Sequence, residues 1–249
     1  MRARRDLSAR DPDRTARRLE AWYRAERADL PWRRAPTPYR TWIAEVMAQQ
    51  TRLEAIVERY RRFVRELPDV RALAACDDER LGSLWAGLGY YARARNLRRG
   101  ARHIVEQLGG RPPTDAAGWR GVPGCGPYTA AAIASIAFGE RIAALDGNGI
   151  RVLSRLEARR EPERVWTRRG EDELRAALGE LVERAARAGD LNQAVMELGQ
   201  RICTRARPRC AECPLAGECR ARARGLQREC PPPRPRPTTR RVELWALVA

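Results

Sequence analysis

The 249-residue sequence contains no lysine, one histidine and two phenylalanines. All 49 basic side chains are therefore arginines. Without lysine, no lysine amine can form an imine intermediate, and this excludes covalent catalysis of that kind. The one histidine, His103, lies in a basic segment that is predicted to be helical, and we expect it at the surface or at an interface without a catalytic role.

Long apolar runs are also missing, so the sequence predicts no membrane span and no membrane partner. The first 18 residues are charged throughout and do not resemble a signal peptide. We therefore expect a soluble, cytoplasmic protein. In that reducing compartment, seven cysteines favour a metal or a cluster over disulfides. The net charge of +17 is dispersed along the chain, which favours a polyanionic partner and most of all a nucleic acid.

Hydrophobic periodicity predicts an all-α protein. A basic lead over residues 1–12 is expected to be disordered, and residues 30–33 are expected to interrupt the helices. The only alternating, strand-like pattern is at 241–248. Helices are expected from about Thr37, as a short helix from Pro68, and over 14–26, 53–67, 81–88, 92–108, 129–138, 150–158, 167–188 and 191–205.

A glycine- and proline-rich turn at 121–130 precedes the alanine-rich helix predicted at 129–138. A glycine turn that opens a helix leaves backbone N–H groups free, and these can hold a phosphate. Asp146 follows that helix as a single carboxylate. The combination suggests chemistry on a nucleic acid, although such turns are common and an ordinary structural turn is an equal alternative.

Several polar or aromatic side chains allow two interpretations. Glu45 follows an apolar stripe and can be an ordinary surface glutamate or a functional acid. Gln49 and Gln50 can cap a helix, face solvent or read base edges. Tyr90 and Tyr91 follow a glycine turn and can belong to the core or wedge into a base stack.

Four of the cysteines are close in sequence, with the spacing C-x6-C-x2-C-x5-C. Zinc sites usually show two separated C-x2-C pairs, and only one close pair is present here. The spacing favours a [4Fe–4S] cluster, with zinc as the alternative. The expected ligands are Cys203, Cys210, Cys213 and Cys219. Cys76, Cys125 and Cys230 are outside this spacing and are expected in the core or in turns.

Together these segments resemble the helix-hairpin-helix DNA glycosylases that carry an iron–sulfur cluster, and most of all the MutY-type adenine glycosylases. The resemblance covers about residues 15–225. The segments that carry it are 30–33, 42–51, 87–97, 121–130, 145–148 and 196–199, together with the cysteine spacing. Related lyases have a catalytic lysine at the position of Tyr128, so the resemblance implies a monofunctional enzyme here.

The resemblance implies a six-helix barrel domain with the hairpin over 30–140 and an iron–sulfur cluster domain built from 1–29 and 141–228. Residues 229–249 resemble a linker and the first strand of a NUDIX-like domain that MutY-type enzymes usually have. Because most of that domain is absent from this sequence, a preference for 8-oxoguanine opposite the adenine is open. Gly149 also departs from the family, which usually has an aliphatic residue there.

The implied reaction is the excision of adenine mispaired with 8-oxoguanine or guanine in double-stranded DNA. The base is flipped into a pocket. A protonated Glu45, in an apolar pocket around Trp32 and Trp42, donates a proton to the purine, and an ionised Asp146 stabilises the oxocarbenium sugar. Tyr128 is expected near Asp146 and the sugar, and Asn148 is expected to hold Asp146 or the attacking water.

The resemblance also implies a set of DNA-binding residues. In this set, Leu30, Trp32 and Gln193 line the adenine pocket, and Gln50 and Tyr90 wedge into the base stack and fill the space beside the orphaned base. Gln49 is a further DNA-binding residue, and the amides of Val122, Gly124 and Gly126 hold a phosphate. A monomer associated with the nucleoid is expected. The alternatives are a G:T mismatch thymine glycosylase of the same branch and a non-catalytic iron–sulfur protein that binds DNA.

Overall fold

The computed structural model describes residues 11–49, 51 and 53–235. Throughout this part of the chain the regular elements are helices and no strand occurs, which confirms the all-α prediction. Gln50 and the strand predicted at 241–248 lie outside the described residues. The helices are α1 (Pro12–Glu26), α2 (Pro31–Arg34), α3 (Pro38–Ala48), α4 (Leu53–Glu66), α5 (Val70–Ala75), α6 (Asp78–Trp85), α7 (Ala92–Gln107), α8 (Ala116–Gly121), α9 (Pro127–Phe138), α10 (Gly147–Glu157), the 3-10 turn η1 (Pro162–Arg164), α11 (Arg168–Arg184), α12 (Ala188–Arg201) and α13 (Arg220–Ala223).

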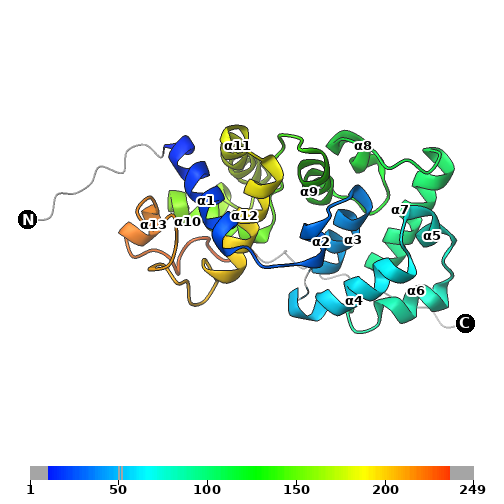
Figure 1. The fold of residues 1–249 in the computed structure, drawn as a ribbon. Coiled ribbons are helices and arrows are strands. Elements are labelled where there is room, and N and C mark those ends of the chain that lie inside the picture. The colour runs from blue at the N-terminus through cyan, green and yellow to red at the C-terminus, as the bar shows by residue number, and fades with distance from the viewer. Residues whose placement is uncertain (1–10, 50, 52, 236–249) are drawn as a thin grey trace, which may run out of the picture.

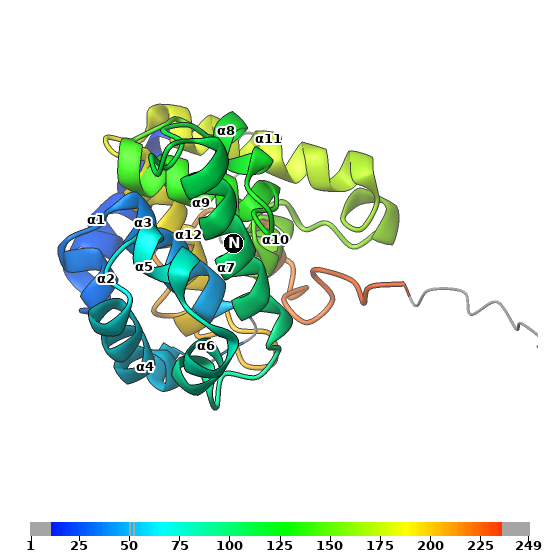
Figure 2. The ribbon, with the colours of Figure 1, turned by 90° about the vertical axis from the view of Figure 1, so that its right-hand side faces the viewer.

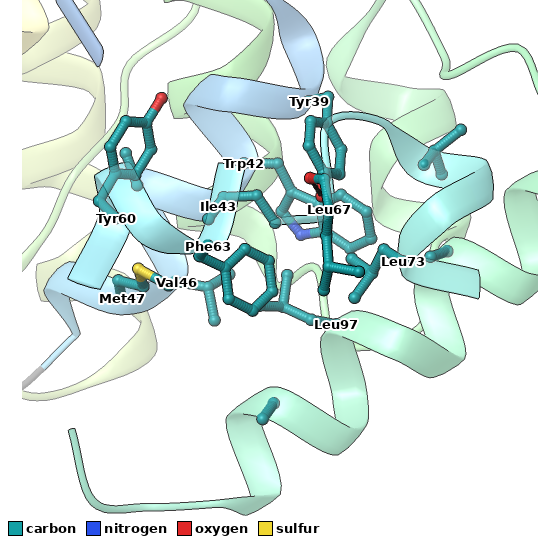
Figure 3. Close-up of a cluster of buried hydrophobic side chains, with 14 of the residues drawn as sticks. Tyr39, Trp42, Ile43, Val46, Met47, Tyr60, Phe63, Leu67, Leu73 and Leu97 are labelled. Atoms are coloured by element: carbon teal, nitrogen blue, oxygen red, sulfur yellow. Dashed lines mark hydrogen bonds between the residues drawn. The ribbon is translucent and has the colours of Figure 1, made fainter. Parts of the chain in front are cut away.

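Two groups of helices lie side by side in Figure 1, with α3–α9 in one and α1 and α10–α13 in the other. The first group surrounds an aromatic core that includes Trp42, Tyr60 and Phe63 (Figure 3). In this core Trp42 packs on Trp119 and Phe63 packs on Trp85. The second core is aliphatic and is built by α1, α10, α11 and α12. The division into two domains with boundaries at 30 and 141 stays a prediction.

A small third cluster joins the two groups, where α9 packs against α12 (Figure 2). Its buried members are Ala131, Ala132, Ala144 and Met196. Small side chains let helix backbones approach closely, so α9 and α12 hold the two cores together. Both α9 and α12 also contribute side chains to the candidate site.

Several element boundaries differ from the sequence prediction. Residues 31–34 form the short helix α2 rather than a break, and α8 and α13 were not predicted. The helix predicted over 167–188 ends at Arg184. It ends there because the guanidinium of Arg141 donates hydrogen bonds to the carbonyl oxygens of Val182, Glu183 and Ala185. This tertiary cap leaves no trace in the local pattern.

Candidate active site

Glu45 on α3 and Tyr128 on α9 face each other within the first helix group, and Tyr128 also packs against the small cluster where α9 meets α12. The Tyr128 hydroxyl donates to Glu45 Oε2 at 2.6 Å and lies 3.4 Å from Met196 Sδ. The interpretation of Glu45 as an ordinary surface glutamate is therefore wrong. Sequence reasoning missed Met196 as a neighbour of this pair, because a methionine on an apolar helix face gives no signal beyond packing.

Burial raises the pKa of Glu45 to about 7, and the negative charge of Asp146 adds to the rise. The hydrogen bond from Tyr128 and the charge of Arg33 act in the opposite direction. A carboxyl group with this pKa holds a proton near neutral pH and can give it away, as a general acid must. Burial and both carboxylates also raise the pKa of Tyr128 well above its ordinary value, so the phenol stays a donor.

Asp146 is the N-cap of α10. Its Oδ1 accepts from the amide of Gly149 and its Oδ2 from Asn148 Nδ2, both at 2.7 Å. Burial raises the pKa of Asp146, while these bonds and the charge of Arg151 favour its ionised form. Asn148 therefore bonds the carboxylate, as the resemblance implied. The charge of Asp146 acts on both Glu45 and Tyr128, so the three groups form one site.

Asn192 and Arg151 hold Asp146 in position, and neither side chain was predicted from the sequence. Asn192 of α12 fixes the loop before Asp146 by accepting from the amide of Ala144 and donating to Ser135 Oγ and the Ile142 carbonyl. Arg151 donates to Asn148 Oδ1 and to the carbonyl of Cys203, each at 2.8 Å. With 49 arginines in the chain, no sequence signal distinguishes Arg151 from the rest.

The hairpin at 121–130 packs against α7. Gly124 has φ +85°, and a Cβ there would lie 2.8 Å from Asn96 Cβ, so this turn requires glycine. The amide of Val122 already donates to the Trp119 carbonyl, whereas the amides of Gly124 and Gly126 have no acceptor among the described residues. The backbone amides that could hold a phosphate are therefore those of Gly124, Gly126 and the first turn of α9, without that of Val122.

The residues predicted to line the adenine pocket have different surroundings. Trp32 is half-buried and packs edge-on against Tyr60, with ring centroids 5.1 Å apart, and Leu30 is buried. Gln193 accepts from Arg33 Nε at 3.2 Å and donates to the Gly189 carbonyl. The ring of Trp42 is buried in the aromatic core against Trp119.

Glu197 of α12 also holds this region and was not assigned a role from the sequence. Its buried carboxylate pairs with Arg33 at 2.6 Å and Arg201 at 2.7 Å, and accepts from the amide of Ala28 at 2.8 Å. It fastens the segment before α2 to α12. A buried carboxylate with this many partners is fully satisfied, and Glu197 thereby also fixes Arg33 beside Gln193.

Gln49 and Tyr90 lie at the edge of the first helix group. Gln49 Nε2 donates to Thr129 Oγ1 of α9 at 3.4 Å. Tyr90 and Tyr91 are 64% and 46% exposed, so the interpretation of the tyrosine pair as core is wrong. A cavity of about 40 Å³ between Gln49, Arg93, Pro123 and Gly124 places the hairpin next to this edge.

The four spaced cysteines line a common cavity. Cys203 Sγ accepts from Arg155 at 3.3 Å, Cys219 Sγ from the amide of Arg222 at 3.5 Å, and Cys210 Sγ from Gln227 at 4.0 Å. Nowhere in the described ranges do three or more His, Cys, Asp or Glu side chains converge on a single metal ion. Thiols spread around a cavity with N–H donors suit a multi-iron cluster, whose corners lie apart.

The second helix group also gathers positive charge beside the start of α10. Gly147 lines a cavity of about 270 Å³ together with Trp166 and five arginines, namely Arg151, Arg155, Arg205, Arg228 and Arg234. The guanidinium of Arg234 lies 5.5 Å from the centroid of the Trp166 ring. Such a field attracts a polyanion toward the end of α10 that carries Asp146.

None of the helices in the described residues has the length and apolar character needed to cross a membrane. A family model for HhH-GPD superfamily base excision DNA repair proteins matches residues 43–183, which include Glu45, the hairpin and Asp146. The chain belongs to this HhH-GPD superfamily. The family predicted from the hairpin, the carboxylates and the cysteine spacing is confirmed.

Curated relatives of this HhH-GPD protein are named adenine DNA glycosylase, the branch that the sequence motifs indicated. The human protein is 42% identical over 221 residues, which cover 85% of this chain and 40% of the relative. The Arabidopsis thaliana protein is 38% identical, with 80% of this chain and 35% of the relative covered. The protein of Buchnera aphidicola subsp. Baizongia pistaciae is 33% identical, with 80% and 56% covered. The chain thus spans about two fifths of the length of the human relative.

Solved structures show the same fold. A thermostable thymine-DNA glycosylase superposes with a TM-score of 0.75 at 23% identity, covering 85% of this chain and 97% of that structure. Endonuclease III in a trapped covalent complex with DNA gives 0.71 at 21% identity, with 88% and 100% covered. At these identities the likeness shows the fold of the HhH-GPD protein and leaves its substrate open.

Proposed function

We propose that this protein is a monofunctional adenine DNA glycosylase that acts on adenine mispaired with 8-oxoguanine or guanine in double-stranded DNA. The observation that carries the proposal is the pairing of two unlike carboxyl groups. Glu45 has a pKa of about 7 and bonds to Tyr128, and Asp146 is held by donors at the start of α10. The relatives named adenine DNA glycosylase support the choice of base.

Each carboxyl group has a distinct step in the proposed reaction. Glu45 gives its proton to a ring nitrogen of the flipped adenine, and the N-glycosidic bond breaks as the protonated base leaves. The anion of Asp146 stabilises the oxocarbenium sugar. Water then adds to the anomeric carbon, and the proton it releases restores Glu45. Because the chain contains no lysine, no lysine imine forms and the strand stays intact.

DNA binding in this proposal uses both helix groups. The free amides of Gly124 and Gly126 and the first turn of α9 hold a backbone phosphate. Trp32, Leu30 and Gln193 border the adenine, and Tyr90 and Gln49 meet the duplex where the base has left. The protein acts as a monomer.

The cysteine cavity holds a [4Fe–4S] cluster in this proposal. Cys203, Cys210, Cys213 and Cys219 are the ligands, and Arg155 and Gln227 donate to their sulfurs. When bound, the cluster cross-links the loop after α12 as a structural centre. Arg155 is buried and also bonds the carbonyls of Thr204, Arg205 and Cys230, so the chain itself shapes this loop around the site.

Release of free base from three duplexes tests the proposed activity. The duplexes carry A:8-oxoguanine, A:G and T:G pairs, and we expect adenine release from the first two. Glu45→Gln and Asp146→Asn should each slow release about 100-fold or more while DNA binding survives. Glu106→Gln and Asp172→Asn, at exposed positions on α7 and α11, serve as matched controls and should act like the wild type.

The same panel separates the alternatives. Thymine release from T:G without adenine release would establish the thymine glycosylase. DNA binding without release of either base would establish a non-catalytic protein. Unchanged release in Glu45→Gln or Asp146→Asn would remove the role assigned to that residue.

A further inference from the structure

The turn between α6 and α7 carries an exposed aromatic ring on a backbone that such a residue rarely adopts. Tyr90 has φ +47° and is 64% exposed, and it follows Gly87 and Gly89, whose φ values are +81° and +67°. A non-glycine residue in the left-handed region is strained. An exposed ring gives no burial in return, so the fold gains nothing evident from this arrangement.

Arg93, near the start of α7, donates hydrogen bonds to the backbone of the turn that carries Tyr90. Its Nη2 donates to the carbonyls of Leu88 and Gly89 at 3.0 and 3.4 Å. The guanidinium also lies 5.5 Å from the ring centroids of both Tyr90 and Trp85. Arg93 thus fixes the backbone of the turn and one side of the exposed ring.

The same guanidinium bonds the end of α3 and the segment after it. Nη1 donates to the carbonyls of Val46 and Met47 at 2.9 and 3.2 Å and to the carbonyl of Gln49. Nη2 lies 3.3 Å from Thr51 Oγ1. The last carbonyls of a helix lack partners within it, and here one arginine supplies them.

Arg93 is therefore the side chain through which two separate segments are joined. One is the Tyr90 turn, and the other is the end of α3 with Gln49 and Thr51. The guanidinium is shielded from solvent enough to lower the pKa of Arg93, and its Nε has no hydrogen-bond partner within the described residues. A shielded cation with an unsatisfied donor is costly, so the bonds that Arg93 makes to the two segments must offset this cost.

We propose that Arg93 is a positioning residue that holds Tyr90 together with Gln49 and Thr51 as a rigid wedge, which fills the duplex when adenine is flipped out. This inference rests on the proposed function. Arg93 does not touch the reacting atoms. It acts by keeping the two halves of the wedge at a fixed separation, so that the cost of ordering them is met in folding rather than on DNA.

Arg98 on the same helix is the matched control. It donates to the Cys76 carbonyl at 3.0 Å and pairs with Asp78 at 2.5 Å, and its side chain is only 12% exposed. Arg98 therefore also fastens a loop to α7, at the junction of α5 and α6 and away from Tyr90. A general loss of rigidity in α7 should follow substitution of either arginine, whereas a wedge defect should follow only that of Arg93.

The experiment compares Arg93→Gln, Arg98→Gln and Tyr90→Ala for melting temperature and for base flipping, using duplexes with 2-aminopurine in place of the target adenine. Arg93→Gln and Tyr90→Ala should each reduce the fluorescence increase on binding and slow adenine release from an A:G duplex by about tenfold. When the adenine faces an abasic site, less unpairing is needed and the loss should shrink to about threefold or less. Arg98→Gln should show no difference between the two duplexes.

Equal losses on both duplexes in Arg93→Gln would reduce Arg93 to a structural residue and overturn the proposal, as would unchanged flipping in Arg93→Gln. Because Arg93→Gln can lower stability, Tyr90→Ala, at an exposed position, provides the second reading, and unchanged flipping in that variant also overturns the wedge. The fluorescence readout needs no catalysis. If the wild type flips 2-aminopurine but releases no adenine, the proposed function is contradicted, while the proposed role of Arg93 in the wedge is not.

Discussion

The carboxyl group of Glu45 has neighbours that act on its pKa in opposite directions. Burial and the charge of Asp146 raise this pKa, and the Tyr128 hydroxyl and Arg33 lower it, with about 7 as the result. Tyr128 therefore does more than orient the acid. By donating to Glu45, it lowers the pKa that burial raises, and in the proposed reaction this keeps Glu45 acidic enough to give up its proton.

Adenine release should depend on pH in a way that Tyr128 controls. The proposed reaction requires a protonated Glu45, so the single-turnover rate should fall as the pH rises through about 7. The proposed reaction also requires an ionised Asp146. Because the pKa of Asp146 is raised, the acid limb of the pH–rate profile should lie above the pH range in which an ordinary aspartate titrates. Tyr128→Phe removes a bond that favours the ionised form of Glu45, which raises the pKa of Glu45 and moves the alkaline limb to higher pH.

Tyr39→Phe is the control for this measurement, because this substitution on α3 removes a comparable buried hydrogen bond, which the Tyr39 hydroxyl donates to the Leu67 carbonyl at 2.7 Å. The alkaline limb of the pH–rate profile of Tyr39→Phe should match that of the wild type. If the limb of Tyr128→Phe also stays in place or moves to lower pH, the hydrogen bond does not set the acidity of Glu45.

At the scale of elements, α10 and α12 decide where Asp146 points. A Cβ on Gly199 of α12 would lie 2.6 Å from Asn148 Cβ and 3.1 Å from its Cα. Only a glycine lets the start of α10 lie this close to α12. The segment 196–199 was part of the sequence resemblance, but its physical reason is a contact that no sequence pattern reveals.

Gly199→Ala should therefore slow adenine release about 100-fold by displacing Asn148 and with it the carboxylate, while most of the fold survives. Circular dichroism and single-turnover rates measure the two effects. Gly179→Ala on α11 is the control, because a Cβ there meets no atom within 4 Å and alanine favours a helix. Similar rates in the two variants would show that the start of α10 tolerates the shift.

Local patterns predicted most helices and missed the ends that tertiary contacts determine. Asp77 and Asp115 cap α6 and α8 by accepting from backbone amides, and neither cap was recognised. Asp146 was assigned only a chemical role, so α10 was expected to begin at Ile150 rather than at Gly147. The motif residues Glu45, Tyr128 and Asp146 could be found from the sequence, whereas Arg93, Arg151 and Asn192 act through carbonyl and amide contacts that the sequence does not encode locally.

At the scale of the whole molecule, the site depends on both helix groups. Glu45 belongs to the first group and Asp146 to the second, and Tyr128 lies on the helix that contacts both. The cysteine loop closes the second group, where Arg151 and Arg155 bond its carbonyls. If the proposed cluster is lost, the group that carries Asp146 should therefore be affected before the group that carries Glu45.

The purified protein should be brown and contain about four irons per chain. Cys213→Ser should lose the iron and lower the melting temperature, because the loop after α12 loses its cross-link. Cys76→Ser replaces a buried thiol outside the cysteine cavity and should keep the iron. A colourless protein with one zinc per chain would contradict the cluster and support the zinc alternative.

The cap that Asp146 forms on α10 has a thermodynamic consequence. Both carboxylate oxygens are already bonded in the free protein, so the rotamer of this side chain is fixed as soon as the helix forms. The entropy of immobilising it is lost once, during folding, and in the proposed reaction it is not lost again in each catalytic cycle. A longer acid such as glutamate would give up this cap, so the geometry of a helix start restricts the choice of anion at position 146.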